Sequence, residues 1–224
     1  MKANDLLKRI REQLGPIADT LRNHPYLASL NSGQVPMEAL KALPGHQYHM
    51  AISDLRSLAT MIQRFGDTPQ VDFFNGILQG QLAERDHILA FASALGMTTD
   101  ELDRYDIQPE GFAYSAYLAW LASYGSAAEI VCSLMVNFPV WGENCRQVGA
   151  DLRVNYGFAA DDTVFFDSFV ERPSIEGEAL KIIQHGLDHG VAEHRIMRAA
   201  RLIQFYEGMF WDAMAKVAAE HSSP

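Results

Sequence analysis

Apolar residues recur along the chain every three or four positions, the spacing that places them on one face of an α-helix. The alternation of apolar and polar residues that marks a half-buried strand occurs nowhere over a useful length. The pattern therefore predicts an all-α protein. We expect its helices over residues 3–23, 36–64, 68–95, 108–124, 126–156, 161–171, 174–190 and 192–220.

Turn-forming residues separate several of these segments, at His24-Pro25, at Asn31-Ser32-Gly33 and at residues 66–69. Thr98, with Glu101 three residues later, offers an N-cap with an acid in the first turn. No Pro/Gly/Ser-rich linker or shift in composition divides the chain, and 48% of its residues are apolar. We expect residues 1–224 to form one domain with a large core.

The last predicted helix carries an acid on its apolar face. Ile203, Glu207, Phe210 and Met214 follow one another at i, i+4, i+7 and i+11 and therefore share one stripe. Burying an unpaired carboxylate costs several kcal/mol or raises its pKa until the group is neutral. Because a shielded carboxyl of raised pKa suits proton transfer, Glu207 is a candidate acid/base. The alternative is a hydrogen-bonded structural acid.

Three further polar side chains fall on apolar faces. Asn137 lies on the core stripe of the helix over 126–156, where Pro139 leaves the carbonyl of Met135 without its helical donor. Asn137 therefore either borders a pocket or satisfies the backbone that Pro139 opens. Tyr48 and Tyr114 also lie on apolar stripes, and buried tyrosines usually find a partner for the hydroxyl. Ordinary core tyrosines remain an alternative, but an acid, an amide and two phenols together favour an internal pocket.

The charge balance narrows the range of partners. The chain has 18 basic and 28 acidic residues and a formal net charge of −10, so nucleic acid is not an expected partner. The N-terminus lacks the apolar stretch of a secretory signal, and Gly125-Ser126 interrupts the most apolar region. We expect a cytoplasmic protein that does not partner with a membrane. Cys132 and Cys145 are expected on one helix, too far apart for a disulfide.

Eight histidines raise the question of a metal site. His185 and His189 stand at i, i+4, a chelating spacing. His87 follows Glu84 at i, i+3, the spacing found in carboxylate-bridged di-iron bundles, but such a site needs the pair twice and the sequence has it once. We therefore expect neither a metal nor another cofactor. If a metal is bound, the candidate ligands are His87, His185, His189 and Glu143.

Five segments spread over the chain carry a family resemblance: residues 24–40, 47–48, 114–143, 165–169 and 206–211. Together they resemble the TenA-type (thiaminase II) family, whose fold is that of haem oxygenase. The resemblance implies a haem-oxygenase-like helical bundle that forms a homodimer or a larger oligomer.

The resemblance also implies a chemistry, hydrolysis at the methylene carbon that links a pyrimidine to its leaving group. In the family a cysteine is the nucleophile, an acid on the C-terminal helix transfers protons, and an aspartate and tyrosines hold the aminopyrimidine. Position by position, the acid matches Glu207, and two pocket tyrosines match Tyr48 and Tyr114.

Four positions depart from the family pattern. Asn137 takes the place of the nucleophilic cysteine, Gly45 that of the aspartate, and Trp141 and Phe169 those of two further tyrosines. An amide cannot perform the displacement that a thiolate does, and Cys132 lies on a different helical face from Asn137. The resemblance implies that the pocket itself is retained. Such a pocket suits a small aromatic or heteroaromatic ligand.

The leading hypothesis is a TenA-like enzyme, acting in thiamin-related pyrimidine salvage or on a different small substrate. Glu207 would be the general acid/base, Tyr48 and Tyr114 would orient the ligand, and Asn137 would donate a hydrogen bond. The alternatives are a haem-oxygenase-like oxidase, either metal-dependent or of the pyrroloquinoline-quinone-synthase type, and a ligand-binding protein without catalysis.

Overall fold

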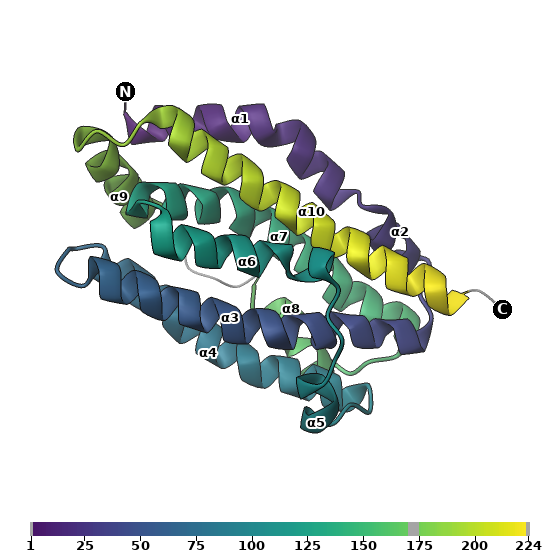
Figure 1. The fold of residues 1–224 in the computed structure, drawn as a ribbon. Coiled ribbons are helices and arrows are strands. Elements are labelled where there is room, and N and C mark those ends of the chain that lie inside the picture. The colour runs from purple at the N-terminus through teal and green to yellow at the C-terminus, as the bar shows by residue number, and fades with distance from the viewer. Residues whose placement is uncertain (1, 170–174, 223–224) are drawn as a thin grey trace.

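The computed structural model describes residues 2–169 and 175–222, which form helices joined by short turns (Figure 1). No strand occurs in these two ranges, so the all-α prediction is confirmed. The long helices are α1 (Ala3–Arg22), α3 (Ala42–Phe65), α4 (Val71–Ala94), α6 (Pro109–Tyr124), α7 (Ala127–Tyr156), α9 (Glu176–Asp188) and α10 (Glu193–Ser222). The short ones are α2 (Pro25–Asn31), η1 (Met37–Lys41), α5 (Thr99–Asp103), η2 (Asp161–Thr163) and α8 (Val164–Asp167).

Two short helices lie where no separate helix was expected. His24-Pro25 starts α2, because Nδ1 of His24 accepts a hydrogen bond from the N–H of Tyr26 and Pro25 occupies the first helical position. At α5, Thr98 and Glu101 form a reciprocal capping box. Both helices are too short to show a helical period, although their caps were visible in the sequence.

The prediction of one helix over 161–171 was wrong within the described residues. The chain forms η2 and then the single turn of α8, which ends at Asp167, while residues 170 and 171 lie outside the described ranges. The hydroxyl of Ser168 donates to the carbonyl of Phe165 at 2.7 Å and so occupies a backbone acceptor at the helix end.

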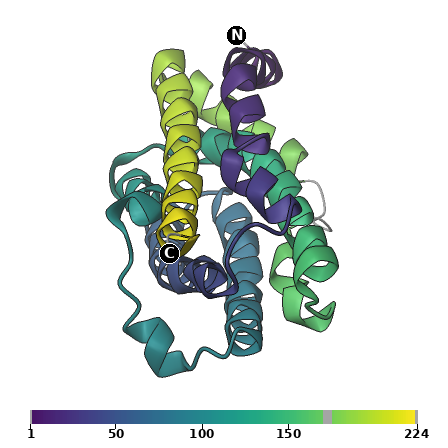
Figure 2. The same ribbon diagram turned by 90° about the vertical axis from the view of Figure 1, so that its right-hand side faces the viewer.

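The bundle is built around α7, which packs against α1, α2, α8, α9 and α10. Figures 1 and 2 show α1 and α10 along one side and the α3–α4 pair along the other, with α6 and α7 between them. Buried apolar residues form two clusters, and α7 contributes to both, with Ile130 and Leu134 in one and Val140 and Val148 in the other. This explains why its sequence is apolar nearly all round.

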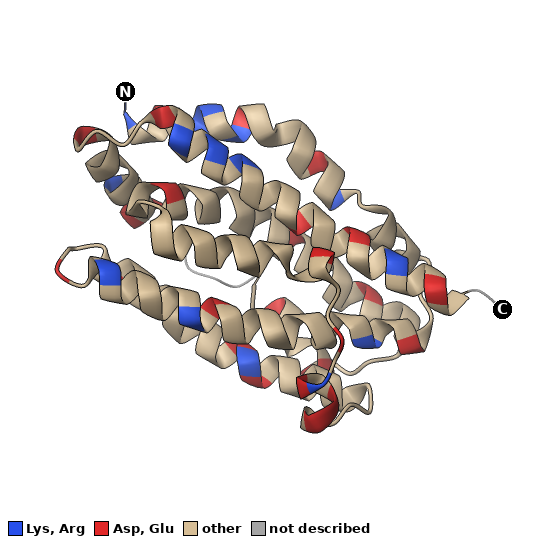
Figure 3. Cartoon of the chain, in the orientation of Figure 1, with Lys and Arg blue, Asp and Glu red and all other residues tan. Residues whose placement is uncertain are grey.

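Charged residues are spread over the outer helices, whereas α6 carries only Glu110 (Figure 3). Within the described residues, every helix is too short or too polar to cross a membrane.

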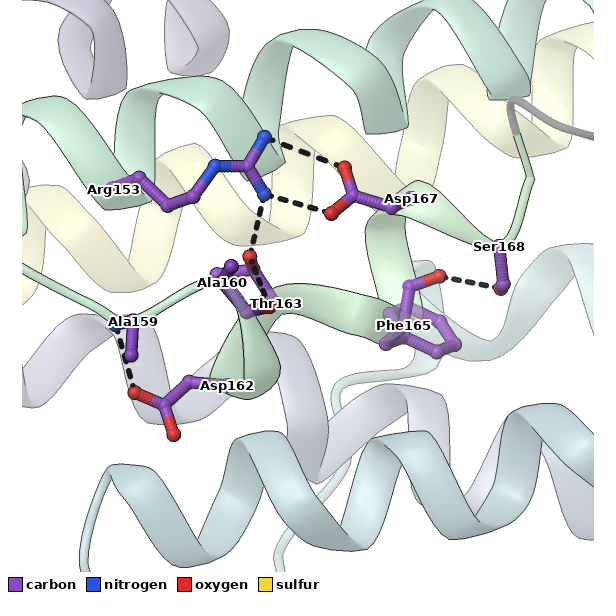
Figure 4. A network of polar contacts seen from close by, with 8 residues as sticks. All are labelled: Arg153, Ala159, Ala160, Asp162, Thr163, Phe165, Asp167 and Ser168. Carbon is purple, nitrogen blue, oxygen red and sulfur yellow. Dashed lines mark hydrogen bonds and ion pairs between the residues drawn. The ribbon is translucent and has the colours of Figure 1, made fainter.

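An arginine on α7 holds the η2–α8 segment in place (Figure 4). Nη1 of Arg153 donates to Oγ1 of Thr163 at 2.6 Å and to Oδ2 of Asp167 at 2.8 Å. These bonds tie the last residue of η2 and the last residue of α8 to one helix, with Phe165 and Phe166 buried in the core. The chain then continues to Phe169, so the network also positions that ring.

The helix α7 runs through Pro139 because other helices satisfy the carbonyls near it. Nη2 of Arg11, on α1, donates to the carbonyl of Met135 at 3.2 Å, which is the acceptor that Pro139 leaves open. One residue along, Nε2 of Gln204 on α10 donates to the carbonyl of Val136 at 2.9 Å. Asn137 does not serve this purpose, so that interpretation of Asn137 was wrong.

We predict that Arg11→Met lowers the free energy of unfolding by about 1–2 kcal/mol, because it removes a charged donor from a carbonyl inside the bundle. In a Pro139→Ala background the residue 139 N–H returns to that carbonyl, so the same change should cost about 1 kcal/mol less. Urea denaturation of the four proteins measures the coupling. If Arg11→Met lowers the free energy of unfolding equally in both backgrounds, Arg11 acts only through its ion pair with Glu176, at 2.8 Å.

Candidate functional site

A cavity lies between the α3–α4 pair and the helices α6, α7 and α10. About 610 Å³ of space lies between its walls, and part of this space is open to solvent. Its walls combine aromatic rings with a few polar groups. They are formed by Gln47, Met50, Ala51, Asp54, Ile77, Gln81, Glu84, Tyr114, Asn137, Phe138, Trp141, Phe169, Glu207 and Phe210.

Glu207 lies in the wall of this cavity and is only 2% exposed. Nδ2 of Asn137 donates to its Oε2 at 2.5 Å, while Nε1 of Trp211 and Nδ2 of Asn144 donate to Oε1 at 3.3 and 3.4 Å. Burial raises the pKa of Glu207 to about 8, although these three donors and the charge of Arg22 act in the opposite direction. The group is therefore poised to exchange a proton near neutral pH.

A hydrogen-bonded chain extends from Glu207 along the cavity wall. The hydroxyl of Tyr114 donates to Oδ1 of Asn137 at 3.1 Å, and the amide nitrogen of Asn137 donates to Glu207. Both polar atoms of the Asn137 side chain are thus in use, which fixes the orientation of the amide. The pKa of Tyr114 is raised well above its usual value, first by burial and then by the nearby Asp54 and Glu207 carboxyls.

Aromatic rings form the other side of the cavity. The ring of Trp141 meets those of Phe169 and Phe210 edge to face, with both pairs of centroids 5.7 Å apart. The cavity thus offers a flat ligand an apolar surface beside the acid.

The structure brings together five of the residues expected at the site and leaves two outside. Tyr114, Asn137, Trp141, Phe169 and Glu207 line the cavity, and Tyr48 and Gly45 do not.

The excluded pair lies on another face of α3. Tyr48 packs edge to face against His49, with centroids 5.5 Å apart. A Cβ atom at Gly45 would approach the ring of Tyr105 to 2.7 Å, so a glycine is needed there for close packing.

Two polar residues on the cavity face of α3 were missed by the sequence reasoning. Gln47 and Asp54 both line the cavity, and burial raises the pKa of Asp54 to about 7 against a smaller opposing effect of Ser115. The sequence did contain a signal, because Gln47, Ala51 and Asp54 stand at i, i+4 and i+7 and so share one face.

Neither cysteine of the chain lines the cavity. Burial raises the pKa of the Cys132 thiol to about 12 and that of Cys145 well above its usual value. Since the thiolate is the reactive form, both residues behave as core side chains.

The candidate metal ligands lie on three helices. The rings of His185 on α9 and of His189, which caps that helix, are tilted, with centroids 4.0 Å apart. His87 lies on α4, and Glu143 of α7 accepts a 2.6 Å hydrogen bond from Arg146. Within residues 2–169 and 175–222, no three His, Cys, Asp or Glu side chains gather in a way that would hold a metal ion.

Known proteins resemble this chain in sequence and in fold. A sequence model described as the TENA/THI-4/PQQC family matches residues 11–216. A curated relative, the aminopyrimidine aminohydrolase of Halalkalibacterium halodurans, is 23% identical over 125 residues, which cover 55% of this chain and 56% of that protein. The match therefore spans little more than half of the relative's length.

Solved structures share the fold at low identity. A TenA homologue of P. horikoshii aligns with a TM-score of 0.74 and 19% identity over 97% of this chain and 100% of its own. One from Pseudomonas syringae pv. tomato gives 0.79 and 15% over 96% of each chain. A Shewanella denitrificans domain with a heme oxygenase-like fold gives 0.74 and 12%, over 96% of this chain and 93% of its own. The expected haem-oxygenase-like fold is confirmed.

The raised pKa of Glu207 predicts a pH-dependent stability. Its pKa lies near 8 in the folded protein, above the ordinary 4.5, so its contribution to stability is complete below about pH 4.5 and is lost as the pH rises towards 8. Each pKa unit corresponds to about 1.4 kcal/mol. Relative to Glu207→Gln, which does not titrate, the wild type should therefore lose a few kcal/mol of unfolding free energy between pH 5 and pH 8. Denaturant titrations of both proteins measure this difference, and a constant difference across that range would contradict the burial argument.

Proposed function

We propose that this chain, which belongs to the TENA/THI-4/PQQC family, is a hydrolase that acts on a small aromatic or heteroaromatic substrate in its internal cavity. The observation that carries the proposal is Glu207, a buried carboxyl of raised pKa that lies in the cavity wall. An aminopyrimidine is the first substrate class to test, because the curated relative is named aminopyrimidine aminohydrolase.

In the proposed reaction, a bond between carbon and a leaving nitrogen is exchanged for a bond to water. Protonated Glu207 gives its proton to the leaving nitrogen as the carbon–nitrogen bond breaks, and the oxygen of water bonds to that carbon. The Glu207 carboxylate then takes a proton from the attacking water. One water is consumed, and an alcohol and a free amine leave, so the acid returns to its starting state.

The surroundings of Glu207 support this use of water as the nucleophile. The family resemblance puts Asn137 at the nucleophile position; in the structure Asn137 donates to Glu207, and the two cysteines lie outside the cavity. A direct attack by water needs no covalent intermediate on the protein. The rings of Trp141 and Phe210 would hold the flat substrate and keep other water away from the reacting bond.

The proposal includes a homo-oligomer. Trp120 and Tyr124 of α6 are 48% and 69% exposed, and Phe205 of the neighbouring α10 is 53% exposed. Exposed aromatic residues on one pair of helices are typical of an interface between subunits. Light scattering after size exclusion should give at least twice the 25.0 kDa chain mass, and a 25.0 kDa species at micromolar concentration would contradict this expectation.

We predict that Glu207→Gln lowers kcat for aminopyrimidine hydrolysis by about 10²–10⁴-fold while the substrate still binds, because the amide cannot transfer a proton. In the wild type, kcat/KM should fall as the pH rises through about 8, since the protonated acid is then lost. Steady-state kinetics against pH, with calorimetry for binding, measure both effects. Glu220→Gln is the control, because Glu220 is an exposed acid near the end of the same helix.

Two outcomes would change this proposal. Unaltered turnover in Glu207→Gln would exclude Glu207 as the acid/base. Binding of aminopyrimidines by the wild type without any turnover would instead identify a ligand-binding protein.

A further inference from the structure

The cavity face of α3 carries polar atoms that the protein leaves without partners. Oδ1 of Asp54 and Nε2 of Gln47 are both buried, and neither makes a hydrogen bond within the described residues. Gln47 as a whole is only 8% exposed. A buried donor or acceptor without a partner costs about 1–3 kcal/mol, so two of them on one wall of a cavity indicate groups that a ligand satisfies.

The neighbouring hydroxyls do not fill the open position on Asp54. Tyr114 lies close enough for the Asp54 charge to raise its pKa, but it donates its proton to Asn137. Ser115 lies beside Asp54 and partly offsets the effect of burial on its pKa, yet its own buried Oγ makes no hydrogen bond of good geometry. A carboxylate oxygen has two lone pairs, so Oδ1 of Asp54 can accept a hydrogen bond from a ligand even when the Ser115 hydroxyl turns towards it.

The charges in the cavity favour a positively charged ligand. Asp54 lies on α3 and Glu207 on α10, and both act on Tyr114 of α6. Among the described lining residues there is no lysine, arginine or histidine. Three acids line the cavity, Asp54, Glu84 and Glu207. A cationic nitrogen beside Asp54 favours the ionised form of that carboxyl, whereas a carboxylate or phosphate finds no positive side chain to pair with.

Asp54 is also the only acid in α3. It follows Gly45, where the family resemblance places a ligand-binding aspartate, by nine residues on the same helix. Nine residues place Asp54 on the opposite face of α3 from Gly45, and it is the face of Asp54 that borders the cavity.

We propose that Asp54 is the specificity-determining carboxyl of the cavity and accepts a hydrogen bond from a positively charged amine or amidine nitrogen of the substrate. This inference rests on the proposed function, in which Glu207 serves the reacting bond. Asp54 would then control substrate binding, while Glu207 controls the chemical step.

The first test compares two flat probes that differ in charge, benzamidine and benzamide, by calorimetry. The wild type should bind benzamidine at least about tenfold more tightly, and Asp54→Asn should lose that preference while its affinity for benzamide is unchanged. Asp67→Asn is the matched control, because Asp67 is an exposed acid just beyond α3 and outside the cavity. Equal affinity of the wild type for both probes would overturn the proposal, as would an Asp54→Asn protein that keeps the preference.

The second test separates Asp54 from Glu207 by kinetics. With an aminopyrimidine as substrate, Asp54→Asn should raise KM about tenfold with little change in kcat, the opposite of Glu207→Gln. An unchanged KM in Asp54→Asn, together with a lost kcat in Glu207→Gln, would overturn the role of Asp54 alone. If circular dichroism shows that Asp54→Asn is misfolded, Asp54→Ser provides the same measurements with a smaller side chain.

Discussion

The burial of one carboxyl group constrains how the central helices pack. Glu207 of α10 is kept from water and takes its hydrogen bonds from Asn137 and Asn144 of α7 and from Trp211 of its own helix. Asn137 and Asn144 are seven residues apart, which is two helical turns, so both face the same side of α7. A shift of either helix by one residue would separate the acid from Asn137 and Asn144 and leave it buried with Trp211 alone as a donor. The acid therefore fixes the register of the two helices that carry the site.

The same region contains Pro139 of α7. The donors that satisfy the carbonyls near this proline come partly from a third helix, α1, which is thereby linked to the site. Arg11 of α1 and Gln204 of α10 supply donors to the two carbonyls that precede Asn137 along the chain. Because these donors take over the backbone acceptors, the side chain of Asn137 is left to bond Tyr114 and Glu207. Along one stretch of α7, Arg11 and Gln204 thus satisfy the backbone carbonyls, whereas the side chain of Asn137 serves the cavity.

The spacing of apolar residues in the sequence predicts much of the fold but only part of the cavity wall. Long amphipathic helices such as α1 show their period clearly, and Glu207 stood out because an acid on an apolar stripe is rare. In α3 the apolar residues surround the helix, and its spacing predicts the stripe through Tyr48 as the inner one, whereas the buried residues include Met50, Leu58 and Met61. The packing of α4 and α6 decides which face looks inward, and a single sequence does not contain that information. Asp54 was overlooked for this reason.

The chain from Tyr114 through Asn137 to Glu207 makes the cavity sensitive to a single proton. An amide has a donor at one end of its side chain and an acceptor at the other. When Glu207 is ionised, Asn137 turns its nitrogen towards the acid and its oxygen towards the phenol, as the structure shows. When a proton binds Oε2 of Glu207, that oxygen becomes a donor to Asn137. The amide of Asn137 then turns end for end, and the phenol of Tyr114 accepts a hydrogen bond and points its own hydrogen into the cavity. A ligand in the cavity would then meet a hydroxyl whose direction depends on the protonation state of an acid two side chains away.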